Sequence, residues 1–518
     1  MSGRLTANGK KESATKRMDT HAAPASVFEP LEPRLQLSAG GAASLLHSFH
    51  PLPVGGMSEI SVGNTAIFYD SYLSPNSAPT GAVEIYDAVH RRWSSASLST
   101  PRSRMTVGTQ GTMVIFAGGL DNSNEPSNRV EIYDSRRHVW SAATLSQARI
   151  DMAVATVGHL VFFAGGESAS HVPSDVVDIY NTRRATWTTA RLSQARTAIT
   201  QVVVANTLVL AGGVAAGTTI NAVDVFNLQT EQWSNHTLMN GGPSIRTAVV
   251  GAKILFLGTD RQQIGALNLF DTTTGRWSTA ALSQTRAEFS VAVQDGKALI
   301  AGGRIYPAND DFSGASRAIL SDAVDVYDAH SNRWSATKLS AARGRPDVVT
   351  AGGVVMFVGG NEVTETGVAA VDVFNDSDAV DVYKPHTGRW TAGKLSAARY
   401  VHGIANGHRV IFAGGVFYAG VDAIDVYNIQ NGHWSAAKLL HGRFEIAQAN
   451  LGSLSLFAGG VEAYLQHPVA DVDVYDSRTG LWSTTSLTEP VGVESDVVIG
   501  RQAIFYGNGT VVDIFSRK

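Results

Sequence analysis

The chain has 518 residues, of which 44% are hydrophobic and 17% charged, with 51 Gly, no Cys and a formal net charge of −4. The apolar content excludes a disordered chain, and the lack of cysteine excludes a disulfide framework and thiolate chemistry. The weak negative charge leaves no basic footprint for nucleic acid, and no apolar run is long enough for a transmembrane helix.

Residues 1–42 come before any β-like pattern, and we expect them to be disordered. Residues 1–26 are basic and polar and lack the apolar stretch of a standard signal peptide. Residues 28–39 read FEPLEPRLQLSA, which resembles the LEPR-XLL segment near the N-terminus of large predicted surface or exported proteins of planctomycetes and related bacteria. The resemblance implies a bacterial protein that is extracellular or associated with the cell envelope.

From residue 56 onward the chain is periodic, and tryptophan marks the period. Consecutive tryptophans are 44 to 57 residues apart, and none falls outside the series: Trp93, Trp140, Trp187, Trp233, Trp277, Trp334, Trp390, Trp434 and Trp482. Such self-similarity is the signature of a repeat architecture. We predict a propeller domain over residues 43–518 with repeats at about 56–98, 102–145, 149–192, 196–238, 246–282, 286–339, 343–395, 399–439, 443–487 and a partial one at 494–516.

Four short β-rich runs make up each repeat. In the third repeat, apolar runs at residues 152–157 and 160–164 flank a Gly-His turn, VVDIY follows at 176–180, and the run around Trp187 is the fourth. Turns between such runs predict an antiparallel meander. The last repeat stops after three runs, and we predict that residues 43–53 supply its fourth strand.

Three features recur in register within the repeat. A Gly-Gly pair such as Gly165-Gly166 ends the second run, an aromatic residue closes the third, and a Trp such as Trp140, Trp187 or Trp334 follows seven residues later. This combination resembles the kelch motif, whose period is about 50 residues. The resemblance implies an all-β fold, a kelch-type β-propeller of about ten four-stranded antiparallel blades. We favour a single ring closed by the N-terminal strand over two smaller rings.

Charged residues recur at two places in the repeat. Arginines follow the Trp run at Arg102, Arg149, Arg196, Arg246, Arg286, Arg343, Arg399 and Arg443. Acids lie in the third run at Glu84, Glu131, Asp178, Asp224, Asp325, Asp381, Asp425, Asp473 and Asp513. Because a buried charge must be paired, we interpret Arg149 and Asp178, and their counterparts, as a structural pair within each blade. A charged ring around the channel is the alternative.

Function on a repeat scaffold lies where the repeats differ, usually in loops. Two repeats are longer than the rest between the Gly-Gly pair and the third run, at residues 304–322 and 361–379, and the second insertion contains a near-copy of the third run. We predict a ligand-binding edge on blades six to nine. Its candidate residues are Arg304, Tyr306, Asn309, Asp310, Asp311, Phe312, Glu362, Glu365, Phe417, Tyr418, Tyr464 and His467.

Catalytic motifs are absent from the sequence, including HExxH, GxSxG, the Walker loop and GxGxxG. Galactose oxidase, a kelch-like copper enzyme, needs a cysteine that this chain lacks, and no BTB or F-box module comes before the repeats. We therefore predict a non-catalytic binding protein without cofactor or metal, whose partner is a protein or a glycan. The alternative is a carbohydrate-active enzyme of the sialic-acid mutarotase-like kelch type.

Overall fold

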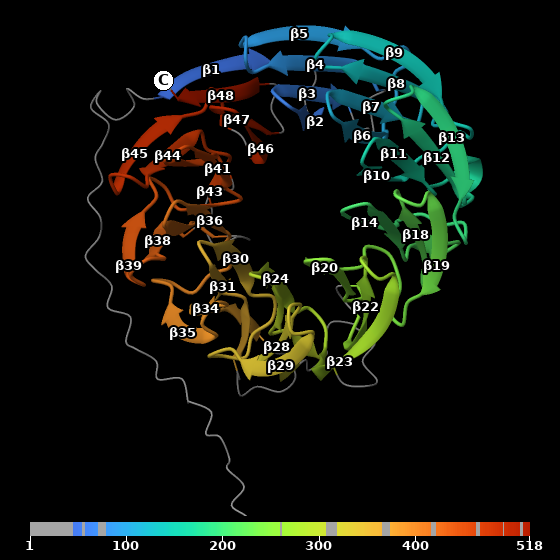
Figure 1. The fold of residues 1–518 in the computed structure, drawn as a ribbon. Helices are drawn as coiled ribbons and strands as arrows, with labels where there is room; N and C mark the ends of the chain where they lie inside the picture. The colour runs from blue at the N-terminus through green and yellow to red at the C-terminus, as the bar shows by residue number, and fades with distance from the viewer. Residues whose placement is uncertain are drawn as a thin grey trace, which may run out of the picture.

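The structure is a computed structural model that describes residues 45–53, 57–70, 79–259, 262–306, 319–364, 373–415, 421–462, 467–490, 492–507 and 511–517. Within these residues, ten four-stranded antiparallel sheets form one closed ring, with the first strand of each sheet near the centre and the fourth at the rim (Figure 1). The predicted single-ring, ten-bladed propeller is therefore confirmed.

The blades follow one another around the ring in chain order. Blades 1 to 5 consist of β2 (Met57–Val62), β3 (Thr65–Asp70), β4 (Ala82–Asp87) and β5 (Arg92–Ser97); β6 (Thr106–Gln110), β7 (Met113–Ala117), β8 (Arg129–Asp134) and β9 (Val139–Thr144); β10 (Ala153–Val157), β11 (Leu160–Ala164), β12 (Val176–Asn181) and β13 (Thr186–Arg191); β14 (Thr200–Val204), β15 (Thr207–Ala211), β18 (Ala222–Asn227) and β19 (Gln232–Thr237); and β20 (Thr247–Val250), β21 (Lys253–Phe256), β22 (Ile264–Asp271) and β23 (Arg276–Arg286).

Blades 6 to 9 consist of β24 (Ser290–Gln294), β25 (Lys297–Ala301), β28 (Ala323–Asp328) and β29 (Arg333–Lys338); β30 (Asp347–Ala351), β31 (Val354–Val358), β34 (Ala379–Lys384) and β35 (Arg389–Lys394); β36 (Gly403–Asn406), β37 (Arg409–Ala413), β38 (Ala423–Asn428) and β39 (Trp434–Lys438); and β41 (Ala447–Leu451), β42 (Leu454–Ala458), β44 (Asp471–Asp476) and β45 (Leu481–Ser486).

Blade 10 is built from both ends of the described chain. It contains β46 (Val493–Ile499), β47 (Gln502–Gly507) and β48 (Val511–Arg517), and its fourth strand is β1 (Leu45–Pro51). β1 pairs antiparallel with β48, with Leu45 opposite Arg517 and Pro51 opposite Val511. The predicted closure by the N-terminal segment is confirmed.

Short ribbons interrupt some connections between second and third strands. They are β16 (Val214–Ala215) with β17 (Thr218–Thr219), β26 (Arg304–Ile305) with β27 (Ile319–Leu320), and β32 (Asn361–Thr364) with β33 (Val373–Asp376), while β43 (Val461–Glu462) pairs with β40 (Arg443–Phe444), and a 3-10 turn spans Ala169–His171. β33 comes from the near-copy of the third run that we noted in the sequence. The copy pairs with β32 instead of joining the blade, because β34 already fills the third position.

The burial patterns explain why these sequences form blades. β11 (LVFFA) and β12 (VVDIYN) are buried on both faces apart from their ends, since each blade is covered by a neighbour on either side. In the fourth strands most residues are exposed because these strands form the rim of the ring: in β13 only Trp187, which packs toward blade 2, and Ala190, which packs toward blade 4, are half-buried.

Ten hydrophobic clusters hold the ring together, one at each junction between neighbouring blades. At the closing junction, Phe68 and Tyr86 of blade 1 pack with Ile504 and Ile514 of blade 10. The repeated tryptophans belong to these clusters: Trp434 and Trp482 are buried, and Trp140, Trp187 and Trp334 are half-buried and packed against the preceding blade.

Candidate functional site

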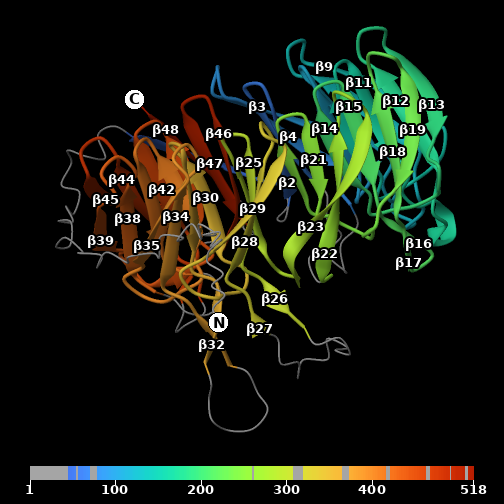
Figure 2. The ribbon, with the colours of Figure 1, turned by 60° about the horizontal axis from the view of Figure 1, so that its bottom comes forward.

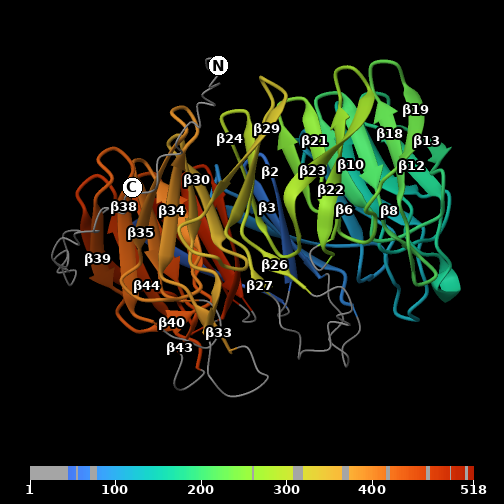
Figure 3. The same cartoon turned by 90° about the horizontal axis from the view of Figure 1, so that it is seen from below.

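The two faces of the ring carry different connections between the strands. In an antiparallel meander, the turns between strands one and two and between strands three and four lie at one edge, and the remaining connections lie at the other. We call the second edge the loop face, defined by the connections between second and third strands and by those between blades. Figures 2 and 3 show the ribbons β26–β27 and β32–β33 projecting from this face.

Buried arginine side chains lie beneath the loop face. The Arg149 side chain is fully buried, and its Nη1 donates to the carbonyl oxygens of Gly165 and Val176, each at 2.7 Å. Its Nη2 donates to the Asp178 carboxylate, which also accepts the Ser146 N–H at 3.0 Å. One guanidinium thus joins the second and third strands of a blade to the connection from the preceding blade.

The same arrangement recurs around the ring. Within the described residues, seven blades hold such a pair: Arg102–Glu131, Arg149–Asp178, Arg196–Asp224, Arg286–Asp325, Arg343–Asp381, Arg399–Asp425 and Arg443–Asp473. All seven arginines are inaccessible to solvent. A group that recurs in most blades, and that no ligand can reach, has a structural role.

Blade 5 breaks the series, and one expectation from the sequence is wrong there. Gly242, not Arg246, takes the arginine's place: the Gly213 N–H donates to the Gly242 carbonyl at 2.7 Å, just as the Gly166 N–H donates to that of Arg196. The guanidinium of Arg246 lies 4.7 Å from the centre of the Phe289 ring. The arginine was misassigned because the connection before it is longer than in the other repeats.

The partner position in blade 5 has changed as well. Asn268 replaces the repeated acid, is 4% exposed, and accepts the Met239 N–H at 2.8 Å. An uncharged glycine and an uncharged amide have therefore replaced both members of the ion pair, which leaves no buried charge without its counter-ion.

The Gly-Gly pairs serve the packing of the loop face. Gly165 has a φ of 64°, and a Cβ atom placed on it would lie 2.4 Å from the carbonyl oxygen of Arg196. Only glycine tolerates both this conformation and this approach.

A cluster that occurs once in the described ring lies on the loop face where blades 5, 6 and 7 meet. We call it the Glu288 cluster, defined by Glu288, Arg304, Tyr306, Arg345 and Gln263. The Tyr306 hydroxyl donates to Glu288 Oε1 at 3.0 Å, Arg345 Nη2 lies 3.3 Å from the same oxygen, and Arg304 Nε lies 3.3 Å from Oε2. Two cations and a phenol thus surround a carboxylate that is 9% exposed.

Backbone contacts make the Glu288 cluster rigid. Gln263 of blade 5 donates its amide N–H to the Tyr306 carbonyl at 3.0 Å and accepts the Tyr306 N–H at 2.9 Å. The Arg345 N–H donates to the Glu288 carbonyl at 3.1 Å. Burial raises the pKa of Tyr306, so its hydroxyl remains a hydrogen-bond donor at neutral pH. These bonds anchor the chain where the longest connection of blade 6 begins.

The structure tests the predicted ligand residues only in part. It brings Arg304 and Tyr306 together, and places His467 apart from them in blade 9, where its carbonyl accepts the Glu462 N–H at 3.0 Å. Glu362 lies on β32, and its side chain is not described. The remaining candidates lie outside the described residues: Asn309, Asp310, Asp311, Phe312, Glu365, Phe417, Tyr418 and Tyr464.

Two members of the cluster were not among the predicted residues. Glu288 and Arg345 each lie two residues after a repeated arginine, and both have positive φ, at 52° and 45°. Arg104 and Asp151 hold the same position in blades 2 and 3 and also form an ion pair. Glu288 and Arg345 could therefore have been identified from the sequence, because residues of opposite charge occupy the position two residues after the repeated arginine in consecutive repeats.

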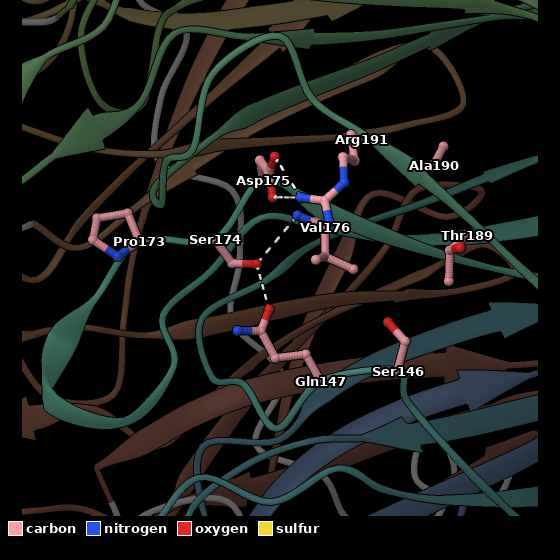
Figure 4. A pocket seen from close by; sticks show the side chains of 9 residues that line it. All are labelled: Ser146, Gln147, Pro173, Ser174, Asp175, Val176, Thr189, Ala190 and Arg191. Carbon is pink, nitrogen blue, oxygen red and sulfur yellow. Dashed lines mark hydrogen bonds and ion pairs between the residues drawn. The ribbon is translucent and has the colours of Figure 1, made fainter.

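A hollow of about 650 Å³ opens at the rim between blades 2 and 3 (Figure 4). Along its wall Ser174 donates to Gln147 at 2.8 Å, and Arg191 donates to both oxygens of Asp175 at 2.7 and 2.8 Å. Equivalent bonds recur in blade 6, where Ser321 donates to Gln284 and Lys338 to Asp322. The hollow therefore follows from the repeat, and we do not regard it as a dedicated site.

In the described part of the chain, no group of three or more histidine, aspartate or glutamate side chains is placed to hold a metal ion. Nor does any helix among these residues have the length and apolar character needed to cross a membrane.

The sequence model of the KLHDC2/KLHL20/DRC7 Kelch-repeats domain matches residues 106–303, which run from the start of β6 to the Gly-Gly pair of blade 6. Together with the ten four-stranded sheets, this match supports a kelch-repeat β-propeller, a fold that commonly serves as a protein-interaction scaffold. A comparison with curated proteins gave no match.

Proposed function

We propose that this chain is a non-catalytic binding protein that takes a partner protein or a glycan on the loop face of blades six to nine. The Glu288 cluster is the observation that carries the proposal. The buried arginine–acid pairs recur in seven blades and serve the fold. The Glu288 cluster instead anchors one end of the longest connection between strands, where a binding surface needs a rigid support.

The contacts of Glu288 favour binding over catalysis. A general base must accept a proton from its substrate, but both oxygens of this carboxylate already face donors, and the group is 9% exposed. The carboxylate is therefore suited to holding the loop in place. A sugar-converting enzyme, the alternative, would need an accessible acid in the same region.

The test measures binding of the full chain to an array of neutral and acidic oligosaccharides and to proteins extracted from a bacterial envelope. Glu288→Gln should weaken any binding found by about tenfold or more, because residue 288 then carries no charge to pair with Arg304 and Arg345. Asp175→Asn, in the repeated hollow, is the matched control and should leave binding unchanged. Equal affinity of the wild type and Glu288→Gln would refute the proposed surface, and turnover of a sugar would favour the enzyme.

We further propose that the chain is exported to the cell envelope or beyond it. The resemblance of residues 28–39 to the LEPR-XLL segment supports this, although the segment lies outside the described residues. Fractionation of a bacterial host should find the full chain outside the cytoplasm. Scrambling residues 28–39 should retain it inside, and an unchanged distribution would count against this role of the segment.

A further inference from the structure

The face of the ring opposite the loop face is built from short turns. We call it the turn face, defined by the turns between first and second strands and by those between third and fourth strands. The former contain two residues and the latter four or five, whereas the ribbons β26–β27 and β32–β33 project from the other face (Figure 2). The turn face therefore lacks the projections of the loop face.

The turn face carries an excess of positive charge. Its turns, together with the strand residues that flank them, contain fifteen Lys or Arg and seven Asp or Glu, which is an excess of eight positive charges. The whole chain has a formal net charge of −4. Positive charge is therefore concentrated on one face, where it creates a local field that the net charge of the chain does not reveal.

Six exposed arginines form the densest part of this surface. They lie where the third strand turns into the fourth in three consecutive blades, between β4 and β5, between β8 and β9, and between β12 and β13: Arg91, Arg92, Arg136, Arg137, Arg183 and Arg184. We call these six residues the arginine arc. No other turn between third and fourth strands in the described ring contains two adjacent arginines.

Few acids accompany the arginine arc. Asp87 and Asp134 begin the first two of its turns, where their carboxylates accept backbone N–H groups of the same turn. In blade 3 the uncharged Asn181 has this role. The turns between first and second strands of the three blades contain no Asp or Glu. Six arginines and two acids leave the arc with four net positive charges.

The exposed apolar side chains beside the arginines are aliphatic. Val89 is 62% exposed and Val139 is 52% exposed, and the turns of blades 1 to 3, all of them described, contain no Phe, Tyr or Trp. Proteins that bind single-stranded nucleic acid stack its bases on aromatic rings. Cations mixed with exposed apolar side chains suit a bilayer surface, where the cations meet phosphates and the apolar groups enter the head-group region.

We propose that the turn face is a docking surface for a membrane rich in anionic lipids, with the arginine arc at its centre. Such a membrane presents many phosphates in one plane, and the short turns of the ring present their arginines at one face. Guanidinium groups bind phosphate through paired N–H donors. The loop face then points away from the membrane, so that a partner on the loop face and the membrane can be bound together.

The number of arginines and the salt concentration set the size of the effect. Each basic residue near an anionic lipid surface strengthens binding by about fivefold. The loss of one arginine pair should therefore weaken binding by about tenfold or more. Because the Debye length falls from about 10 Å at 0.1 M salt to about 3 Å at 1 M, high salt should release the chain.

Cosedimentation of the full chain with vesicles tests the docking surface. We expect binding to vesicles of phosphatidylglycerol and phosphatidylcholine in equal amounts at about 0.1 M NaCl, release at about 1 M, and no binding to phosphatidylcholine alone. Absence of binding to the anionic vesicles would overturn the proposal. Binding to soluble heparin without binding to vesicles would also overturn it, because the face would then serve a soluble polyanion.

A pair of variants separates the turn face from the overall charge. Arg183→Gln with Arg184→Gln should weaken vesicle binding by about tenfold or more. Arg129→Gln with Arg191→Gln is the matched control, because it removes two exposed arginines at the loop-face ends of β8 and β13, in blades 2 and 3. The control should bind nearly as the wild type does. Equal losses in the two variants would overturn the assignment to the turn face.

A fluorescent label reports which face meets the lipid. The chain has no cysteine, so Val89→Cys and Val172→Cys each create a single site for an environment-sensitive dye. Val172 is 55% exposed and lies on the loop face, in the connection between β11 and β12. Binding to anionic vesicles should shift the emission of the dye at residue 89 to the blue and leave that at residue 172 unchanged. A shift at residue 172, or at neither position, would overturn the proposed orientation.

Discussion

Replacing Arg399 by methionine should destabilise the ring far more than replacing an exposed base in the same blade. Arg399 and Asp425 are both 0% exposed and lie 2.7 Å apart. Arg399 also donates to the carbonyls of Gly414 at 2.9 Å and Ala397 at 3.0 Å. Without the guanidinium, the buried carboxylate keeps only the donors of Ser396, and such a loss typically costs about 3–5 kcal/mol.

A second substitution should reverse part of this loss. Blade 5 shows that a blade can form with Gly242 and Asn268, both uncharged, in place of the pair. Asp425→Asn in the Arg399→Met background removes the buried negative charge that has lost its arginine partner. We therefore expect the double variant to lose less stability than the sum of the two single variants, by about 1–3 kcal/mol.

Urea unfolding followed by tryptophan fluorescence measures these differences. Because the urea m-value increases with protein size and is larger for this ring than the roughly 1–3 kcal/mol/M of small proteins, Arg399→Met should lower the midpoint by about 0.5 M or more. Lys438→Met is the control: Lys438 pairs with Asp422 at 2.7 Å, but both side chains are largely exposed, so its loss should cost under about 1 kcal/mol. Equal losses for the two variants, or additive effects in the double variant, would refute the structural role of the buried pair.

Three further outcomes are expected. Gly165→Ala should lower stability by about 1–3 kcal/mol in the same assay, because its φ is 64° and its Cβ would meet the Arg196 carbonyl; an unchanged midpoint would contradict this. Deleting residues 1–51 should lower the melting temperature and promote association, since β48 loses its partner, whereas a monomer of full stability would contradict closure by β1. The hydrogen bond to Asp347 raises the pKa of His402, so Asp347→Asn should lower the pKa measured by NMR titration, and an unmoved value would contradict the bond.

Some features of this protein could be read from its local sequence because every blade repeats them. The Trp period, the turns and the apolar runs each report on a few neighbouring residues, and in register they predicted ten four-stranded sheets. The absence of a tenth tryptophan predicted that β1 would complete the last blade. Such patterns can be recognised in the sequence because a sheet packed between two others needs similar residues in every copy.

The residues of the candidate site were harder to predict from the sequence, because they come from different blades. Arg304 and Tyr306 were singled out, but Glu288 and Arg345 lie 16 and 41 residues away from Arg304 in the chain and meet it only in the ring. The sequence placed Arg246 at the position of the repeated arginines, but Arg246 contacts Phe289 instead. The length of the longer connection before blade 5 does not show which of its residues reaches that position. Contacts between blades depend on where the closed ring places each loop.

The sequence by itself thus determined the fold class, the number of blades and the closing strand, since these follow from local periodicity and from the need to complete a sheet. Only the tertiary structure decided that blade 5 lacks the buried ion pair, which carboxylate anchors the loop face, and that His47 and His50 lie beside the repeated acids of blades 10 and 1. Those properties depend on distance and solvent exposure, and both are set by packing between segments far apart in the chain.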